Sequence, residues 1–291
     1  MSAGPRGRAA VLFPIALLLV AMASMQLGAA FAKGLFPRVG PQGATAMRLM
    51  FSALILAVVR RPWRGLRIDR SVLPLVAYGV SLGAMNTLFY MALRTVPLGI
   101  AVALEFVGPL TVASAASRRW RDRAWIALAA AGLLMLLPLA RGARAVDIGG
   151  AMLALTSGAC WALYIVFGRR VGRAFGPPAT ALGMVIAAVV FVPIGVARAG
   201  PGLFSLDVLP SGLLLAVLSS AVPYSLEMVA LTRLPVRAFG ALMSLEPAIG
   251  ALAGVAVLGE HPTPLQWAGI AAVIGASIGT TMTLEPQEPP I

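Results

Sequence analysis

Four ionisable side chains lie inside long apolar stretches of the sequence, where they could bind charge or exchange protons. They are Arg48, Glu105, Glu227 and Glu246. An ionisable group at mid-bilayer costs at least about 2.5 kcal/mol, so it seldom occurs without a partner or a task. A buried carboxyl group can bind a cation or take up a proton, and an arginine can bind a carboxylate through two hydrogen bonds. The sequence therefore predicts a polar site inside a membrane.

Prolines mark the places where two of these acids lie. Pro109 removes the hydrogen bond to the carbonyl of Glu105, four residues earlier, and Pro247 directly follows Glu246. Proline-interrupted spans at matching places in two halves of a chain are typical of central substrate sites in transporters. Ordinary helix kinking would also explain the prolines. Glu105 and Glu246 are thus near-equivalent candidates for binding.

The elements that must position these residues are ten apolar stretches, each close to the ~20 residues that a helix needs to cross the hydrocarbon core. Apolar residues make up 59% of the chain, against roughly 45–50% in soluble domains, and the mean hydropathy is +0.91. The connections are too short to fold as soluble domains. The expected spans are 11–31, 43–59, 72–93, 98–116, 124–140, 148–167, 179–197, 209–231, 238–258 and 265–284.

The first half of the chain recurs faintly in the second. Residues between Ser81 and Pro109 reappear at a constant offset of 138 positions, from Ser219 to Pro247. With five spans in each copy, the second copy enters the bilayer from the opposite side, as in many secondary transporters. We therefore predict an all-α integral membrane protein of ten transmembrane helices. They form two inverted five-helix repeats, at 1–140 and 147–284, followed by a disordered cytoplasmic tail at 285–291.

The net charge of +13 follows membrane topology and does not gather into the patch or stripe of a nucleic-acid-binding protein. With the N-terminus inside, sixteen arginines fall in inner segments and five in outer ones, as the positive-inside rule requires. Both termini are therefore expected in the cytoplasm. A cleaved signal peptide ending near Ala32 is the alternative at the N-terminus, but its removal would leave nine spans and reverse the charge bias.

Few residues could support catalysis or bind a cofactor. Cys160 is the only cysteine and His261 the only histidine. A membrane enzyme needs a reactive group, such as a histidine paired with a carboxylate or a metal cluster, and a channel of this kind needs a ring of identical pore residues. We therefore expect no enzyme activity, no cofactor, no metal and no nucleic-acid partner.

Small residues indicate how the spans pack. Gly250 and Gly254 form one G-x-x-x-G pattern, and Gly275 and Gly279 form another. Such faces let helices approach closely. Contacts within the chain are the favoured interpretation, and a homodimer through either face is the alternative.

Longer runs carry a resemblance to a known family. The run from Pro97 to Pro109, PLGIAVALEFVGP, and the run from Phe239 to Pro247, FGALMSLEP, are similar to the EamA-type branch of the drug/metabolite transporter superfamily. The similarity covers essentially the whole chain. It implies a ten-helix fold of two inverted repeats in a bacterial inner membrane, which exports small amino acids of the threonine and homoserine type by proton antiport. Another metabolite or a drug is the alternative substrate, because members of the superfamily carry very different solutes.

A zwitterionic amino acid would fit the charges in the spans. Its ammonium is expected at Glu105 and Glu246, and its carboxylate at Arg48 or at Lys33, which lies at the outer end of the first span. Four polar residues could contact a hydroxyl on the substrate or simply bond between helices: Tyr164, Tyr224, Asn86 and Ser219.

Glu105 is the residue expected to couple transport to protons. It lies mid-span beside a proline-freed carbonyl, where burial penalises the charged carboxylate, so it could exchange a proton for the substrate in each cycle. A static salt bridge with Arg48 or Lys33 is the alternative. For Glu227, six residues before Arg233, a structural role is at least equally well supported.

Overall fold

The computed structural model describes residues 5–64, 72–115, 120–136, 147–176, 178–233, 239 and 242–283, and their regular structure is entirely helical. The tail expected at 285–291 and most of the junction between the expected repeats lie outside these residues. By length and hydropathy, four of the described helices can cross a membrane. They run over Leu12–Arg60, Val72–Ala92, Ile148–Phe175 and Ala179–Ala199.

The first helix, α1 (Pro5–Arg60), contains two of the expected spans. It is kinked at Gly40, where φ is 67° and ψ is 170°. A positive φ suits glycine, which has no Cβ, and Pro41 then restarts the helix at a position where a missing N–H costs little. A loop was expected between residues 31 and 43, but the structure has helix there, interrupted only by the kink at Gly40.

Most other helices coincide with one expected span each. They are α2 (Val72–Ala92), α5 (Trp120–Leu136), α6 (Ile148–Phe175), α7 (Ala179–Ala199) and α12 (Pro264–Thr283). Asp147 caps α6 by accepting a hydrogen bond from the backbone N–H of Gly150 at 2.7 Å and one from Thr95 Oγ1 at 3.0 Å. These bonds hold the pKa of Asp147 below its usual range. The helix continues past the expected end near 167, which extends its arginine-rich last turns beyond the apolar stretch.

Two expected spans are broken, as the prolines predict. The fourth span divides at Phe106 into α3 (Leu98–Glu105) and α4 (Val107–Ala115). In the ninth span, the turn at residues 244–245 precedes α11 (Glu246–Leu258). Glu105 is thus the last residue of one helix, and Glu246 is the first residue of another. Each acid lies at a helix end in the middle of an apolar span.

The eighth span contains a π-helical turn that the sequence did not predict. It consists of α8 (Leu209–Ala216), the π-helical segment η3 (Val217–Ala221) and α9 (Val222–Arg233). The N–H of Val222 bonds to the carbonyl of Val217, five residues earlier. Pro223 has no N–H, so the carbonyl of Ser219, four residues earlier, loses its α-helical partner. This carbonyl is therefore available to a side chain from another helix.

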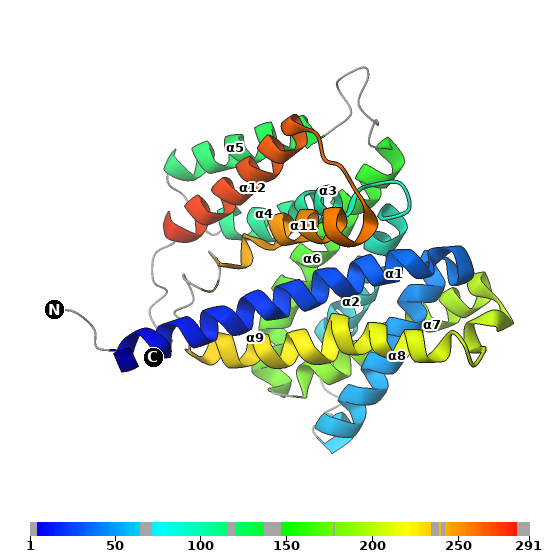
Figure 1. The fold of residues 1–291 in the computed structure, drawn as a ribbon. Helices are drawn as coiled ribbons and strands as arrows, with labels where there is room; N and C mark the ends of the chain where they lie inside the picture. The colour runs from blue at the N-terminus through cyan, green and yellow to red at the C-terminus, as the bar shows by residue number, and fades with distance from the viewer. Residues whose placement is uncertain are drawn as a thin grey trace.

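Helices that are distant in sequence pack side by side (Figure 1). α5 lies against α12, α3 against α11, and α2 against α6. Before its kink, α1 packs on α9, where Leu18 contacts Ala230, and after the kink it packs on α7, where Ala46 lies against Gly195. Each of these pairs joins an element of the first half to one of the second, so the two halves share one core.

The glycine patterns face neighbouring helices of the same chain. A Cβ added at Gly250 would lie 3.1 Å from a side-chain atom of Val102 on α3, and one added at Gly279 would lie 2.3 Å from the ring of Trp125 on α5. These faces are already occupied within the chain. Gly250 and Gly279 therefore make contacts within the chain, in line with the favoured interpretation, and a homodimer through either pattern stays an untested prediction.

Candidate functional site

A cavity of about 200 Å³ lies among α1, α2, α3, α6, α9 and α11. Side chains of both charge signs line it: Arg48, Glu105, Glu227 and Glu246. The remaining lining is mostly apolar or aromatic: Met25, Gln26, Ala29, Leu82, Met85, Asn86, Phe89, Trp161, Tyr164 and Met243. Residues from both halves of the chain therefore meet in one small, charged site.

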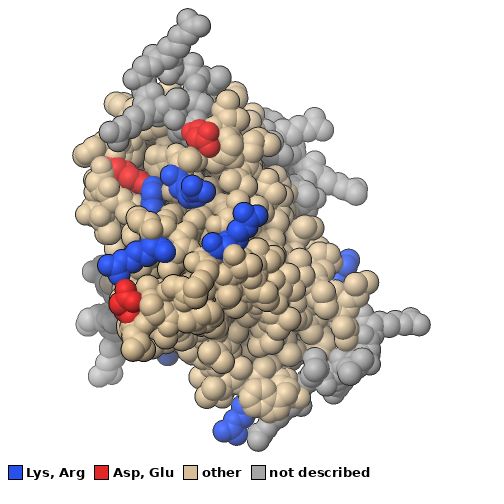
Figure 2. Space-filling model, turned by 90° about the vertical axis from the view of Figure 1, so that its right-hand side faces the viewer, with Lys and Arg blue, Asp and Glu red and all other residues tan. Residues whose placement is uncertain are grey.

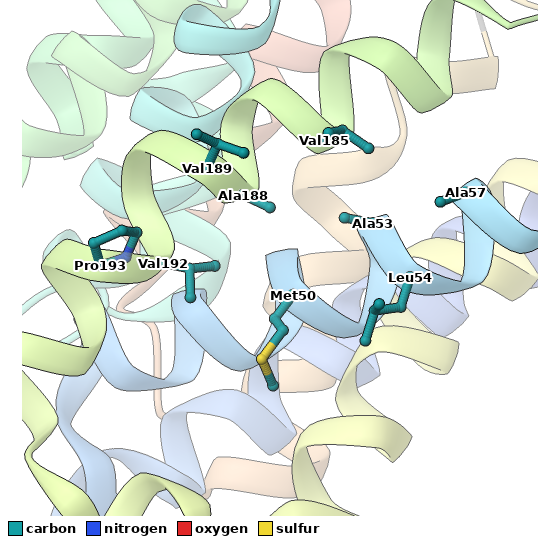
Figure 3. Close-up of a pocket in the computed structure, with 9 residues that line it drawn as sticks. All are labelled: Met50, Ala53, Leu54, Ala57, Val185, Ala188, Val189, Val192 and Pro193. Atoms are coloured by element: carbon teal, nitrogen blue, oxygen red, sulfur yellow. The ribbon is translucent and has the colours of Figure 1, made fainter. Parts of the chain in front are cut away.

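A second cavity, of about 500 Å³, is larger but has no charged lining (Figure 3). It lies between the last part of α1 and α7, and side chains such as Met50, Leu54, Val189 and Pro193 border it. Among the described residues, no charged or hydrogen-bonding side chain lines it, so these residues offer no partner to a polar solute. The smaller, charged cavity is the candidate functional site.

Arg48 is held in the cavity wall by the π-helical segment η3. Its Nη2 donates to the freed carbonyl of Ser219 at 3.1 Å, and its Nη1 donates to the hydroxyl of Tyr90 at 3.4 Å. The guanidinium carbon also lies 5.6 Å from the ring centroid of Tyr90, a distance typical of cation–π contacts. These contacts orient a planar group that can bind a carboxylate through two hydrogen bonds.

Glu105 is positioned by α6. Ser157 Oγ donates to its Oε1 at 2.5 Å and also lies 2.8 Å from the carbonyl oxygen of Met85. The next residue of α6, Gly158, packs so closely on Glu105 that an added Cβ would come within 2.4 Å of the Glu105 carbonyl oxygen. This carbonyl is the one that Pro109 leaves without a helical partner. A glycine is thus required where α6 crosses the break in the fourth span.

Glu246 is positioned by the first part of α1. Gln26 Nε2 donates to its Oε1 at 3.1 Å. Only 4% of the surface of Glu246 is exposed. The two near-equivalent acids therefore line the same cavity but have different polar partners, a hydroxyl for Glu105 and an amide for Glu246.

The other polar candidates divide into two groups. Asn86 and Tyr164 line the cavity; Asn86 donates to the carbonyl of Leu82 in its own helix at 2.8 Å, and Tyr164 stacks on Tyr78 with ring centroids 4.8 Å apart. Ser219 is buried, but its side chain is not among the lining groups, and its backbone carbonyl binds Arg48 instead. The side chain of Tyr224 lies outside the described part of the structure.

Lys33 does not reach the cavity. Its Nζ lies 2.6 Å from Oε1 of Glu260, and Oε2 of that carboxylate accepts a hydrogen bond from the backbone N–H of Leu98 at 2.8 Å. The ion pair therefore connects α1 to the start of α3 and to the segment after α11. Figure 2 looks onto the right-hand side of Figure 1, and on this face most acidic and basic side chains gather in the upper left part, beside one another. Arg48 is thus the basic residue among the cavity's described lining groups.

Glu227 lines the cavity, although its sequence neighbour Arg233 is directed elsewhere. The guanidinium carbon of Arg233 lies 5.3 Å from the ring centroid of Phe13. The site residues that the sequence did not single out include Gln26, Ser157 and Trp161. Gln26 carried a usable signal, since an amide inside an apolar span needs a polar partner. Trp161 carried none, because its contact with Phe106 appears only once α6 packs on α3.

Comparisons with known proteins agree with this picture. Residues 148–282 match the EamA-like transporter family. Over 277 residues the chain is 54% identical to the threonine/homoserine exporter RhtA of Escherichia coli (strain K12), with 95% of this chain and 94% of the relative covered. The chain belongs to the EamA-like transporter family. As a member of this family it moves a solute across a membrane, and the expectation that it is not an enzyme is confirmed by these relatives.

Other relatives of this EamA-like transporter extend the comparison. The threonine/homoserine exporter RhtA of Salmonella typhimurium (strain LT2) is 54% identical over 279 residues, with 95% of each chain covered. The uncharacterized transporter YwfM of Bacillus subtilis (strain 168) is 27% identical over 267 residues, which are 83% of this chain and 86% of the relative. A crystal structure that is 20% identical, with 92% of this chain and 96% of that chain covered, superimposes with a TM-score of 0.60 and so shares the fold.

Proposed function

We propose that this EamA-like transporter exports small amino acids of the threonine and homoserine type across the inner membrane of a bacterial cell. The observation that carries the proposal is the charged cavity in which Arg48 and three acids, Glu105, Glu227 and Glu246, come together. A free amino acid is a zwitterion and needs partners of both signs. Relatives that are 54% identical over nearly their whole length are named exporters of threonine and homoserine.

The size of the cavity supports a small substrate. Its volume is about 200 Å³, whereas sites for drug-sized ligands are roughly 300–1,000 Å³. This difference favours a small amino acid over a drug-like solute. In this proposal Arg48 binds the carboxylate, the acids supply the negative charge that the ammonium needs, and Asn86 or Tyr164 is a polar lining group for a hydroxyl.

Export is coupled to protons at Glu105 in this proposal. The hydrogen bonds of Ser157 support this role of Glu105, because Ser157 can form a hydrogen bond with Glu105 whether the acid is ionised or protonated. An ionised Glu105 accepts from Ser157 Oγ, whereas a protonated Glu105 can donate to Ser157 Oγ, which then donates to the carbonyl of Met85. Protonation from outside releases the substrate, and substrate binding from the cytoplasm releases the proton.

Two inverted five-helix repeats are the architecture proposed for this cycle. The pairing of α5 with α12, of α3 with α11 and of α7 with the last part of α1 supports it, because each pair joins corresponding spans of the two halves. The pairing of α2 with α6 corresponds to that of α9 with the first part of α1. Rocking of one repeat against the other around a fixed central site would provide alternating access.

Both termini face the cytoplasm in this arrangement. The arginine bias supports it, and α1 begins at the same end of the molecule at which α12 ends (Figure 1). A reporter protein fused after Thr283 should be active only if it is one that works in the cytoplasm. Activity of a periplasmic reporter at this position would mean that the number of spans is odd and would overturn the proposed topology.

Counterflow in proteoliposomes tests the proposed substrate. Vesicles that contain the purified protein and unlabelled threonine should transiently accumulate labelled threonine or homoserine from outside, because exchange needs no external energy. Protein-free vesicles provide the control. Exchange of another solute without exchange of either amino acid would show that this chain is an EamA-type carrier of a different metabolite.

A further inference from the structure

Two residues that line the central cavity each hold a buried hydrogen-bond acceptor without a donor in the described part of the chain. Oε1 of Gln26 and Oε2 of Glu246 have no hydrogen-bond partner in the described part of the chain. Their side chains are joined to each other through Nε2 of Gln26 and Oε1 of Glu246, and only 3% and 4% of the two residues' surfaces are exposed. Buried polar atoms are rarely left unpaired in native proteins. This pair therefore points to a donor that arrives with a ligand.

The chemistry of the pair selects a cationic donor with several N–H groups. The free atoms are a carboxylate oxygen and an amide oxygen, and both can only accept. A primary ammonium has three donors and no acceptor, and its charge complements that of Glu246. A ligand carboxylate at this place would put its acceptor oxygens next to the two acceptor oxygens of Gln26 and Glu246. The ligand carboxylate is therefore expected elsewhere in the cavity.

Gly250 packs beside one of these acceptors, Oε1 of Gln26. It lies one turn after Glu246 on α11, and an added Cβ would come within 3.3 Å of Oε1 of Gln26. A larger residue would crowd the amide against α3, where Val102 is already 3.1 Å from the same position. This glycine of the G-x-x-x-G pattern thus makes room for the Gln26 amide as well as for a neighbouring helix.

Glu105, another acid of the cavity, has a different environment. Glu105 already accepts a hydrogen bond from Ser157 at 2.5 Å. Glu246 instead lies beside Gln26, whose Oε1 accepts no hydrogen bond in the described part of the chain. The two near-equivalent acids are therefore suited to different tasks, Glu246 to binding a cation and Glu105 to exchanging a proton with its hydroxyl neighbour.

We infer that Gln26 and Glu246 together form the site for the ammonium group of the transported amino acid, and that Gln26 determines specificity for substrates with a primary amine. This inference rests on the proposed function, which supplies the amine. The substrate then lies with its ammonium between α1 and α11 and its carboxylate at Arg48. Glu105 remains available for the proton.

Binding of threonine and of 3-hydroxybutyrate, which lacks only the amino group, tests this assignment. Isothermal titration calorimetry on the purified full-length protein in detergent should show that the wild type binds threonine about tenfold or more tightly than 3-hydroxybutyrate. Gln26→Leu should lose about tenfold in affinity for threonine and keep its affinity for 3-hydroxybutyrate. Gln42→Leu is the matched control, since Gln42 is a half-buried glutamine of α1 outside the cavity lining, and it should behave as the wild type does.

The possible outcomes separate the inference from the proposed function. If Gln26→Leu weakened both ligands equally, Gln26 would have a structural role and the inference would be overturned. Unchanged threonine affinity would also overturn it, and the two acceptors would then be served by water. Gln26→Met, which has a similar length and no strong hydrogen-bonding group, repeats the test if the leucine variant does not purify as a single species. Failure of the proposed function would differ, because the wild type itself would bind neither threonine nor homoserine.

Discussion

Replacing Glu105 with glutamine is expected to abolish substrate movement driven by a pH gradient while leaving the protein folded and inserted. Glutamine has nearly the same shape, and its amide oxygen can still accept the hydrogen bond from Ser157 that is 2.5 Å long in the wild type. The amide does not titrate, however, so the proton cannot be exchanged for the substrate. Flux into proteoliposomes under an imposed pH gradient should fall to the level of protein-free vesicles. Counterflow at equal pH should persist within a few-fold of wild type.

Glu260→Gln serves as the control for this experiment. Glu260 is a carboxylate in an ion pair with Lys33 outside the central cavity, so its neutralisation should leave the dependence of flux on the pH gradient in place. Full gradient-driven export by Glu105→Gln would show that Glu105 is not the coupling residue. Glu246, the near-equivalent acid of the second half, would then be the next candidate for coupling, and its assignment to the ammonium would need revision.

Replacing Arg48 with lysine is expected to raise the substrate concentration for half-maximal counterflow by about tenfold or more. The guanidinium can bind the carbonyl of Ser219, approach the hydroxyl of Tyr90 and still present N–H groups to a carboxylate. A lysine ammonium carries its three donors on one nitrogen and lacks the planar fork of a guanidinium. It could still donate to the carbonyl of Ser219, but it could not make two parallel hydrogen bonds to the substrate carboxylate at the same time.

Arg38→Lys provides a matched control, because Arg38 is exposed and its ion pair with Asp207 is 3.6 Å long. Exposed pairs of this kind contribute little, so this variant should transport as the wild type does. An unchanged apparent affinity in Arg48→Lys would rule out bidentate recognition of the carboxylate. Arg48 would then be a structural residue whose main task is to hold η3 against α1 and α2.

Much of the fold could be predicted because membrane spans are long, apolar and separated by charged turns. Most helices coincide with one expected span, although α1 contains two, and the breaks next to Glu105 and Glu246 occur where Pro109 and Pro247 indicated. The kink at Gly40 was harder to predict, since a positive φ at one glycine leaves no trace in hydropathy. The π-helical segment from Val217 was likewise invisible, because it depends on which carbonyl each N–H selects.

The candidate site could be predicted in its charges but not in its contacts. Arg48, Glu105 and Glu246 were found because a charge in an apolar span stands out. Lys33 stood out for the same reason. Its partner Glu260 lies far along the chain, however, so the sequence alone could not show that the two residues form an ion pair. Gln26 was passed over because a neutral amide perturbs hydropathy less than a charge does, although its buried oxygen makes it as informative.

Pro223 shows how a binding site can depend on a residue that never faces the ligand. Any other amino acid at this position would return an N–H to the chain, and in the α-helical pattern this N–H would bond to the carbonyl of Ser219. Arg48 would then lose the acceptor that now holds it at 3.1 Å. Neither the proline nor the serine side chain is among the groups that line the cavity. The orientation of Arg48 therefore depends on the N–H that Pro223 lacks, in a helix of the other half of the chain.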